Sequence, residues 1–112
     1  MSKQYNWYRL SDEQVAEEKA ITVHEVNGKK ICFTRHQGQL YAFAYKCPHA
    51  GGVMADGFMD DKGNVTCPLH RYRFNVKNGY NSSGEGFYLK TYPVELREEG
   101  VFVGLEKSWL GW

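Results

Sequence analysis

The sequence lacks the features of several large classes of protein. It has no apolar run of about 18 residues, which excludes a membrane-spanning helix, and its first residues lack the apolar core of a secretory signal peptide. The 112 residues carry a net charge of only +1, so no strong field draws the chain to nucleic acid or to an anionic membrane. We therefore expect a single domain over residues 1–112, located in the cytoplasm.

Cysteine is also scarce, and the three cysteines cannot all pair in a disulfide framework. Two of them lie beside histidine, in the segments Cys47-Pro48-His49 and Cys67-Pro68-Leu69-His70, which is typical of a metal site. The third, Cys32, lies in a strand-like stretch, where we expect a small buried hydrophobic residue. The remaining histidines, His24 and His36, are expected to be solvated surface residues.

Short β-strands separated by turns account for most of the chain. Asn27-Gly28 between two strand-like runs predicts a hairpin with a type I′ turn. Pro93 has no backbone N–H to donate to a neighbouring strand, so its strand is expected to lie at the edge of a sheet or to contain a bulge there. Ser11 begins a possible helical turn that ends by Glu18. The fold class is therefore all-β, a small antiparallel barrel or sandwich. Strands are expected at residues 7–10, 21–26, 29–35, 40–44, 57–59, 64–66, 72–76, 89–96 and 101–105.

The candidate ligands are Cys47, His49, Cys67 and His70. Thiolate and imidazole both bind zinc, so a structural zinc site in an interaction domain is one hypothesis. Zinc ligands are usually separated by two to four residues, whereas a single residue separates Cys47 from His49. That spacing directs the two side chains apart and suits two metal atoms. It favours a [2Fe–2S] cluster in which two histidines replace two cysteines on one iron.

The two segments resemble the cluster-binding boxes of Rieske-type ferredoxins. The similarity covers residues 47–54, residues 67–70, Phe74 and Gly79, and the strand pattern extends it over nearly the whole chain. It implies a Rieske iron–sulfur protein fold, in which a cluster-binding subdomain of two hairpin loops, about residues 45–76, is inserted in an antiparallel β base.

The resemblance also implies one Rieske [2Fe–2S] cluster per chain. Cys47 and Cys67 would bind the inner iron, and His49 and His70 the outer iron near the surface. Reduction makes a ligating imidazole more basic, so the reduction potential should fall with rising pH in the alkaline range. No residue of the chain is expected to be catalytic.

Near these ligands, the sequence differs from the Rieske pattern in three respects. Gly52 and Leu69 replace the cysteines that form a disulfide in membrane-complex Rieske proteins. Tyr72 and Phe74 replace the serine and tyrosine that donate hydrogen bonds to sulfur in high-potential members, which predicts a potential in the lower part of the range of about −150 to +300 mV. Arg71 stands where soluble ferredoxins often have glycine.

By this resemblance the chain is a one-electron carrier. It would accept electrons from a flavin-dependent reductase and pass them to a terminal oxygenase or another oxidoreductase, and it would not be an enzyme by itself. A small subunit of an NAD(P)H-dependent nitrite reductase is the alternative, and the zinc-binding interaction domain is the second alternative. The apolar tail at residues 108–112 is expected to pack on the body or to contact a partner.

Overall fold

The computed structural model describes residues 4–10, 16–47, 52–68, 71–81 and 88–106, and this part of the chain is almost entirely β-strand and turn. It contains no helix that is long and apolar enough to span a membrane. The all-β prediction is confirmed. The elements are β1 Tyr5–Arg9, β2 Ile21–Val26, β3 Lys29–His36, β4 Gln39–Ala44, the 3₁₀ turn η1 Met54–Asp56, β5 Phe58–Met59, β6 Asn64–Thr66, β7 Arg73–Asn75, β8 Thr91–Tyr92, β9 Val94–Arg97 and β10 Gly100–Glu106.

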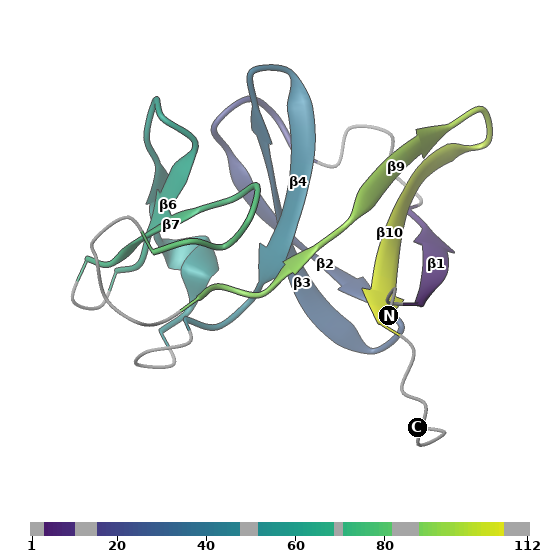
Figure 1. Cartoon of the computed structure of the whole chain (residues 1–112), viewed down its shortest axis with the longest axis horizontal. Coiled ribbons are helices and arrows are strands. Elements are labelled where there is room, and N and C mark those ends of the chain that lie inside the picture. Colours follow the sequence, from purple (N-terminus) through teal and green to yellow (C-terminus); the bar gives the residue numbers. More distant parts are fainter. Residues whose placement is uncertain (1–3, 11–15, 48–51, 69–70, 82–87, 107–112) are drawn as a thin grey trace.

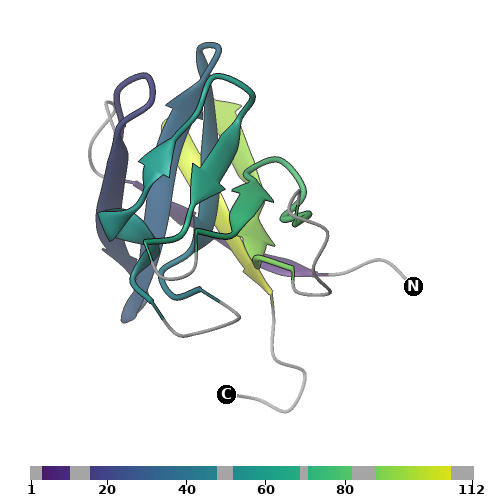
Figure 2. The same ribbon diagram turned by 90° about the vertical axis from the view of Figure 1, so that its left-hand side faces the viewer.

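The strands form three antiparallel sheets in the described residues, with the orders β1-β10-β9, β2-β3-β4-β8 and β5-β6-β7. The sheets are open and do not close into a barrel. Figure 1 shows the sheet of β2–β4 between the other two. In Figure 2, which views the molecule from the side of β5–β7, that small sheet lies in front of the central one and β9–β10 lie behind.

Consecutive residues of β3 point to opposite faces of the central sheet, and an apolar core covers each face. Ile31 and Phe33 face one apolar core, shared with β10, whereas Cys32 faces a second core, shared with β5–β7. Phe43 of β4 and Phe74 of β7 are fully buried in this second core. Burial of each such ring contributes about 1.5–3 kcal/mol. The small sheet is therefore held to the rest of the molecule by apolar packing.

The turn after β2 confirms the predicted hairpin. Asn27 and Gly28 both have positive φ angles, 51° and 79°, as a type I′ turn requires. The turn between β3 and β4 repeats this geometry at Gln37 and Gly38, with φ angles of 53° and 79°. The two turns set the register of β2, β3 and β4, from which the chain continues to Cys47.

Pro93 divides the predicted strand 89–96 into two strands of different sheets. β8 pairs with β4, whereas β9 pairs with β10. The Pro93 carbonyl still accepts a hydrogen bond from the Gly104 N–H at 2.9 Å. Proline has no N–H to donate, and the chain changes sheets at that residue.

Two further expectations were wrong where the structure describes them. Residues 16–18 are not helical; Glu18 instead forms a bridge with Arg35, and residues 11–15 of the predicted helical turn lie outside the described residues. His36 is not a surface residue, because only 5% of it is exposed and its ring lies against Gly63 of the β5–β6 hairpin. The tail at residues 108–112 also lies outside the described residues.

Candidate metal centre

The two predicted cysteine ligands occupy equivalent positions in two hairpins. Cys47 follows the bridge between Lys46 and Val53, and Cys67 follows the pair Thr66–Arg73, so the offset is the same in both (46 to 53 and 66 to 73). The N–H of Cys47 donates to the Gly52 carbonyl at 2.7 Å, and the N–H of Cys67 donates to the Tyr72 carbonyl at 2.8 Å. Each cysteine is therefore the first residue of a loop, and the hydrogen bond from its backbone N–H closes that loop.

Both cysteines are buried against the second core. Cys47 is 3% exposed and Cys67 is fully buried, and no disulfide joins the cysteines that the structure describes. Their apolar neighbours in this core include Met54, Val65 and Phe74. Two buried sulfurs from separate hairpins in one apolar core fit a pair of thiolates on an inner metal, because thiolate is the soft ligand that iron–sulfur clusters use.

The predicted histidine ligands, His49 and His70, lie outside the described residues. Within the part that the structure describes, no group of three or more histidine, cysteine, aspartate and glutamate side chains is close enough to hold a metal ion. The structure thus brings the two cysteines into one core, and the four-ligand set as a whole remains a prediction.

Cys32 lies in the same core as the two predicted cysteine ligands, and its environment favours the thiol. Burial raises the pKa of Cys32 to about 12. The thiolate is the form that binds metal, and Cys32 stays protonated over the ordinary pH range. The expectation that it is a buried hydrophobic residue is confirmed.

Arg71 has the backbone conformation that explains the preference for glycine at its position. Its φ angle is +57°, in the left-handed region that glycine enters without steric cost. The residue is exposed and lies just before Tyr72, whose carbonyl closes the loop of Cys67. The arginine therefore keeps the turn at some conformational cost and adds a positive charge beside the predicted ligands.

Gly57 is a positioning residue that the sequence analysis missed. A Cβ atom added there would lie 2.0 Å from the Thr66 carbonyl oxygen, so only glycine permits the chain after η1 to pass this close to β6. Thr66 directly precedes Cys67, and η1 is linked to the first hairpin by the hydrogen bond from Met54 N–H to the Tyr45 carbonyl at 2.8 Å. The close approach at Gly57 thus fixes one cysteine loop relative to the other. The available signal was a glycine at the first position of the predicted strand 57–59.

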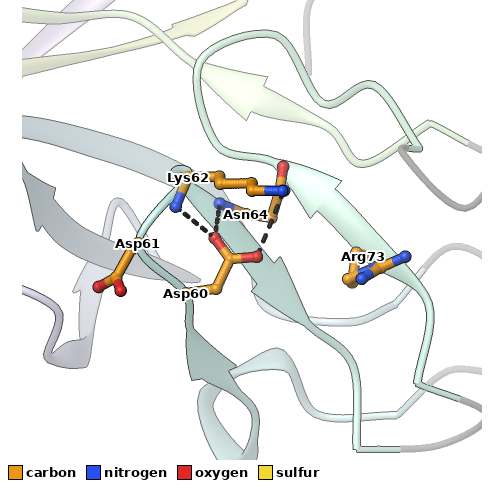
Figure 3. A pocket seen from close by; sticks show the side chains of 5 residues that line it. All are labelled: Asp60, Asp61, Lys62, Asn64 and Arg73. Carbon is orange, nitrogen blue, oxygen red and sulfur yellow. Dashed lines mark hydrogen bonds between the residues drawn. The ribbon is translucent and has the colours of Figure 1, made fainter.

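A polar cavity of about 490 Å³ opens at the β5–β6 turn, and it does not include the cysteines. The Asp60 carboxylate accepts hydrogen bonds from the N–H groups of Lys62 and Asn64, both at 2.9 Å (Figure 3). Burial opposes ionisation of Asp60, but these hydrogen bonds and the charge of Arg73 outweigh it and lower the pKa. The positive charge of Arg73 therefore acts on Asp60.

Comparison with known proteins identifies the family of the chain. Residues 6–93 match the model of the Rieske [2Fe-2S] domain. The chain belongs to the Rieske [2Fe-2S] family. It therefore carries a Rieske [2Fe–2S] cluster, which sets aside the zinc hypothesis.

Curated members of the Rieske family include relatives in bacterial oxygenase systems. The chain is 35% identical over 83 residues to the ferredoxin component of the naphthalene 1,2-dioxygenase/salicylate 5-hydroxylase systems of Ralstonia sp, covering 73% of this chain and 79% of the relative. It is 33% identical over 81 residues to the ferredoxin component of the naphthalene 1,2-dioxygenase system of Pseudomonas aeruginosa, covering 71% and 77%.

Solved Rieske structures share the fold. The ferredoxin of carbazole 1,9a-dioxygenase from Nocardioides aromaticivorans IC177 superposes with a TM-score of 0.76 at 21% identity, over 90% of this chain and 98% of that one. A nitrite reductase small subunit from Mycobacterium tuberculosis gives a TM-score of 0.77 at 18% identity, over 94% and 97%. The Rieske fold prediction is thereby confirmed, and the chain is an electron carrier of this family.

Proposed function

We propose that this chain is a cytoplasmic, single-domain Rieske ferredoxin that carries single electrons from a flavin-dependent reductase to a terminal oxygenase and is not itself an enzyme. The observation that carries the proposal is the pair of buried cysteines, Cys47 and Cys67, at equivalent positions of two hairpins. The curated relatives at 33–35% identity are ferredoxin components of such oxygenase systems.

In this proposal, residues 1–112 form one domain and residues 45–76, approximately, form its cluster-binding subdomain. Cys47 and Cys67 hold the inner iron, and His49 and His70 hold the outer iron. The described residues contribute the dry wall behind the sulfurs, including Val65 and Phe74, and the close approach at Gly57 that fixes the two loops. When bound, the cluster supplies reversible one-electron chemistry.

The first experiment tests the ligand set on the purified protein. We expect iron and sulfide in equal amounts, a red-brown colour and an anisotropic EPR signal after reduction. Cys47→Ser and Cys67→Ser should abolish this signal, whereas His49→Cys and His70→Cys should lower the reduction potential of whatever cluster assembles. Cys32→Ala is the matched control and should retain the signal. A colourless protein that binds one zinc ion would contradict the proposal.

The reduction potential provides a second readout of the same ligands. We expect a value in the lower part of the Rieske range of about −150 to +300 mV, which falls as the pH rises into the alkaline range. Protein-film voltammetry between neutral and strongly alkaline pH measures it. A potential that does not change over this range would remove histidine ligation from the proposal.

The nitrite reductase small subunit is the second candidate function, favoured by the fold shared with the small subunit from Mycobacterium tuberculosis. Reconstitution separates the two. A carrier for oxygenases should restore substrate-dependent oxygen uptake when added to a reductase and a terminal oxygenase of a naphthalene dioxygenase system. Co-purification of the native protein with a large siroheme-containing subunit, without activity in the oxygenase assay, would favour the second candidate.

A further inference from the structure

The outer edge of β9 is open in the described part of the chain. β9 is the terminal strand of the sheet β1-β10-β9, and no described strand pairs with its second edge. Leu96, at the centre of this edge, is 77% exposed, although its cross-strand neighbour Val101 is buried. An open edge that displays a large apolar side chain is a template for pairing with another strand.

The hydrogen-bond pattern shows which backbone groups face this open edge. The Gly104 N–H donates to the Pro93 carbonyl, so this pair is a hydrogen-bonded position of the antiparallel ladder. Such positions alternate along the strands, and the register pairs Glu95 with Phe102 and Arg97 with Gly100. Glu95 and Arg97 therefore direct their backbone groups to β10. The N–H and C=O of Leu96, between them, point outwards.

The side chains that flank Leu96 are self-complementary. Glu95 precedes it and Arg97 follows it, so a two-fold axis through Leu96 places Glu95 of one copy opposite Arg97 of the other, twice. The same axis brings two Leu96 side chains together and makes Leu96 a hydrogen-bonded pair with its own equivalent.

Arg97 has partners within its own chain. Its guanidinium lies 4.4 Å from the ring centroid of Phe102 and 5.2 Å from that of Trp7, and its Nε lies 3.0 Å from a carboxylate oxygen of Glu95. The guanidinium thus lies over β10 and β1, so association exchanges the internal Glu95–Arg97 ion pair of each chain for two ion pairs between the chains. Two other edge strands also expose an apolar side chain. Phe58 belongs to β5, which has only two residues, and Val23 of β2 is 39% exposed, against 77% for Leu96.

We propose that the outer edge of β9 pairs with the same edge of a second copy of this chain, antiparallel and two-fold symmetric about Leu96, to form a homodimer. The β9–β10 hairpin and the β5–β6–β7 sheet lie on opposite sides of the central sheet (Figure 1), so the pairing leaves the β5–β6–β7 sheet uncovered in both copies. The interface is centred on one strand of four residues, so we expect the association to be reversible and concentration-dependent.

Sedimentation equilibrium of the full-length, cluster-loaded protein tests the proposal. We expect a monomer–dimer equilibrium. Glu95→Arg and Arg97→Glu each oppose like charges at two places and should weaken the association at least about tenfold. An equimolar mixture of the two variants should regain it, because every charge of one then faces its opposite on the other. Glu25→Arg, the same charge change on the edge strand β2, is the matched control and should leave the association constant unchanged.

Leu96→Pro provides an independent variant. The Leu96 N–H points away from β10, so proline removes an intermolecular donor and leaves the β9–β10 hydrogen bonds in place. We expect a monomer with an unchanged circular dichroism spectrum; if this variant misfolds, the charge variants and their mixture decide. A wild-type protein that remains monomeric to millimolar concentration would overturn the proposal. So would a dimer that none of the variants weakens, or a mixture that associates no better than either charge variant alone.

Discussion

At the scale of single residues, Gly63 and His36 form a contact between the central sheet and the β5–β6 hairpin. Gly63 has a φ angle of +84°, and a Cβ atom there would lie 3.0 Å from the His36 ring. Gly38 has a similar φ angle of +79° but open space around it. The two glycines therefore share a conformational requirement and differ in packing.

We expect Gly63→Ala to destabilise the protein more than Gly38→Ala. Both substitutions carry the cost of a left-handed alanine, about 1–2 kcal/mol, and Gly63→Ala adds overpacking against His36, about 1–3 kcal/mol. Urea denaturation of both variants measures the difference in the free energy of unfolding. Equal losses would mean that the His36 ring moves aside without cost.

Cys32 predicts a loss of stability at high pH. Burial raises the pKa of its thiol from 9.0 to about 12, so above pH 9 the thiol ionises in the unfolded chain while it stays protonated in the folded one. Its contribution is complete below pH 9 and is lost as the pH rises towards 12. The free energy of unfolding should therefore fall more steeply between pH 9 and 12 in the wild type than in Cys32→Ala. Parallel curves would contradict this assignment.

Among the contacts between secondary-structure elements, Glu18 connects the segment before β2 to the β3–β4 turn. Its carboxylate accepts hydrogen bonds from the N–H groups of Gln37 at 2.7 Å and Gly38 at 3.0 Å. These bonds, that of Gly38 first, lower the pKa of Glu18 below its usual 4.5. The carboxylate thus stabilises a type I′ turn whose two donors would otherwise face water.

We expect Glu18→Gln to lower the thermal unfolding temperature at neutral pH. The contribution of the carboxylate is present above pH 4.5 and is lost as the pH falls through the lower pKa of the folded state. Thermal unfolding between pH 3 and 7 should therefore show that the variant and the wild type converge in acid. Glu17→Gln, at the neighbouring exposed position, is the matched control. A difference that persists unchanged at pH 3 would contradict the role of the charge.

In the whole molecule, only one of the two apolar cores contains the predicted cysteine ligands. The core shared by β3 and β10 contains neither Cys47 nor Cys67, whereas the core shared with β5–β7 contains both. A cluster held by buried cysteines stabilises the elements that carry them, because metal binding is coupled to folding. The small sheet of β5–β7 therefore depends on the metal centre more than the β base does.

We expect iron removal to unfold the small sheet locally. Backbone amides of β6 and β7 should lose hydrogen-exchange protection when the cluster is removed with a chelator, while amides of β2 and β3 keep most of theirs. Hydrogen exchange with mass spectrometry on cluster-loaded and iron-free protein measures this. A uniform loss of protection across all sheets would mean that the two cores unfold as one unit.

Local chemistry made much of this protein predictable from its sequence. Asn27-Gly28 specified a hairpin because the two residues tolerate positive φ, and the prediction of Asn64–Thr66 as a strand agrees with β6. The spacing of Cys47-x-His49 favoured two irons over one zinc, and family membership supports the cluster. These features depend on a few consecutive residues.

Only the tertiary structure decided the features that join distant parts of the chain. His36 is buried because the β5–β6 turn covers it, and Pro93 stands between two strands that belong to different sheets. Likewise, Gly57 fixes the two cysteine loops through a close approach to Thr66. Each depends on which surfaces pack together, and packing is set by the whole set of apolar contacts. The sequence alone therefore determined most of the strands, the Asn27-Gly28 turn and the cofactor of this protein, and long-range packing determined how the two cysteine hairpins are held against one core.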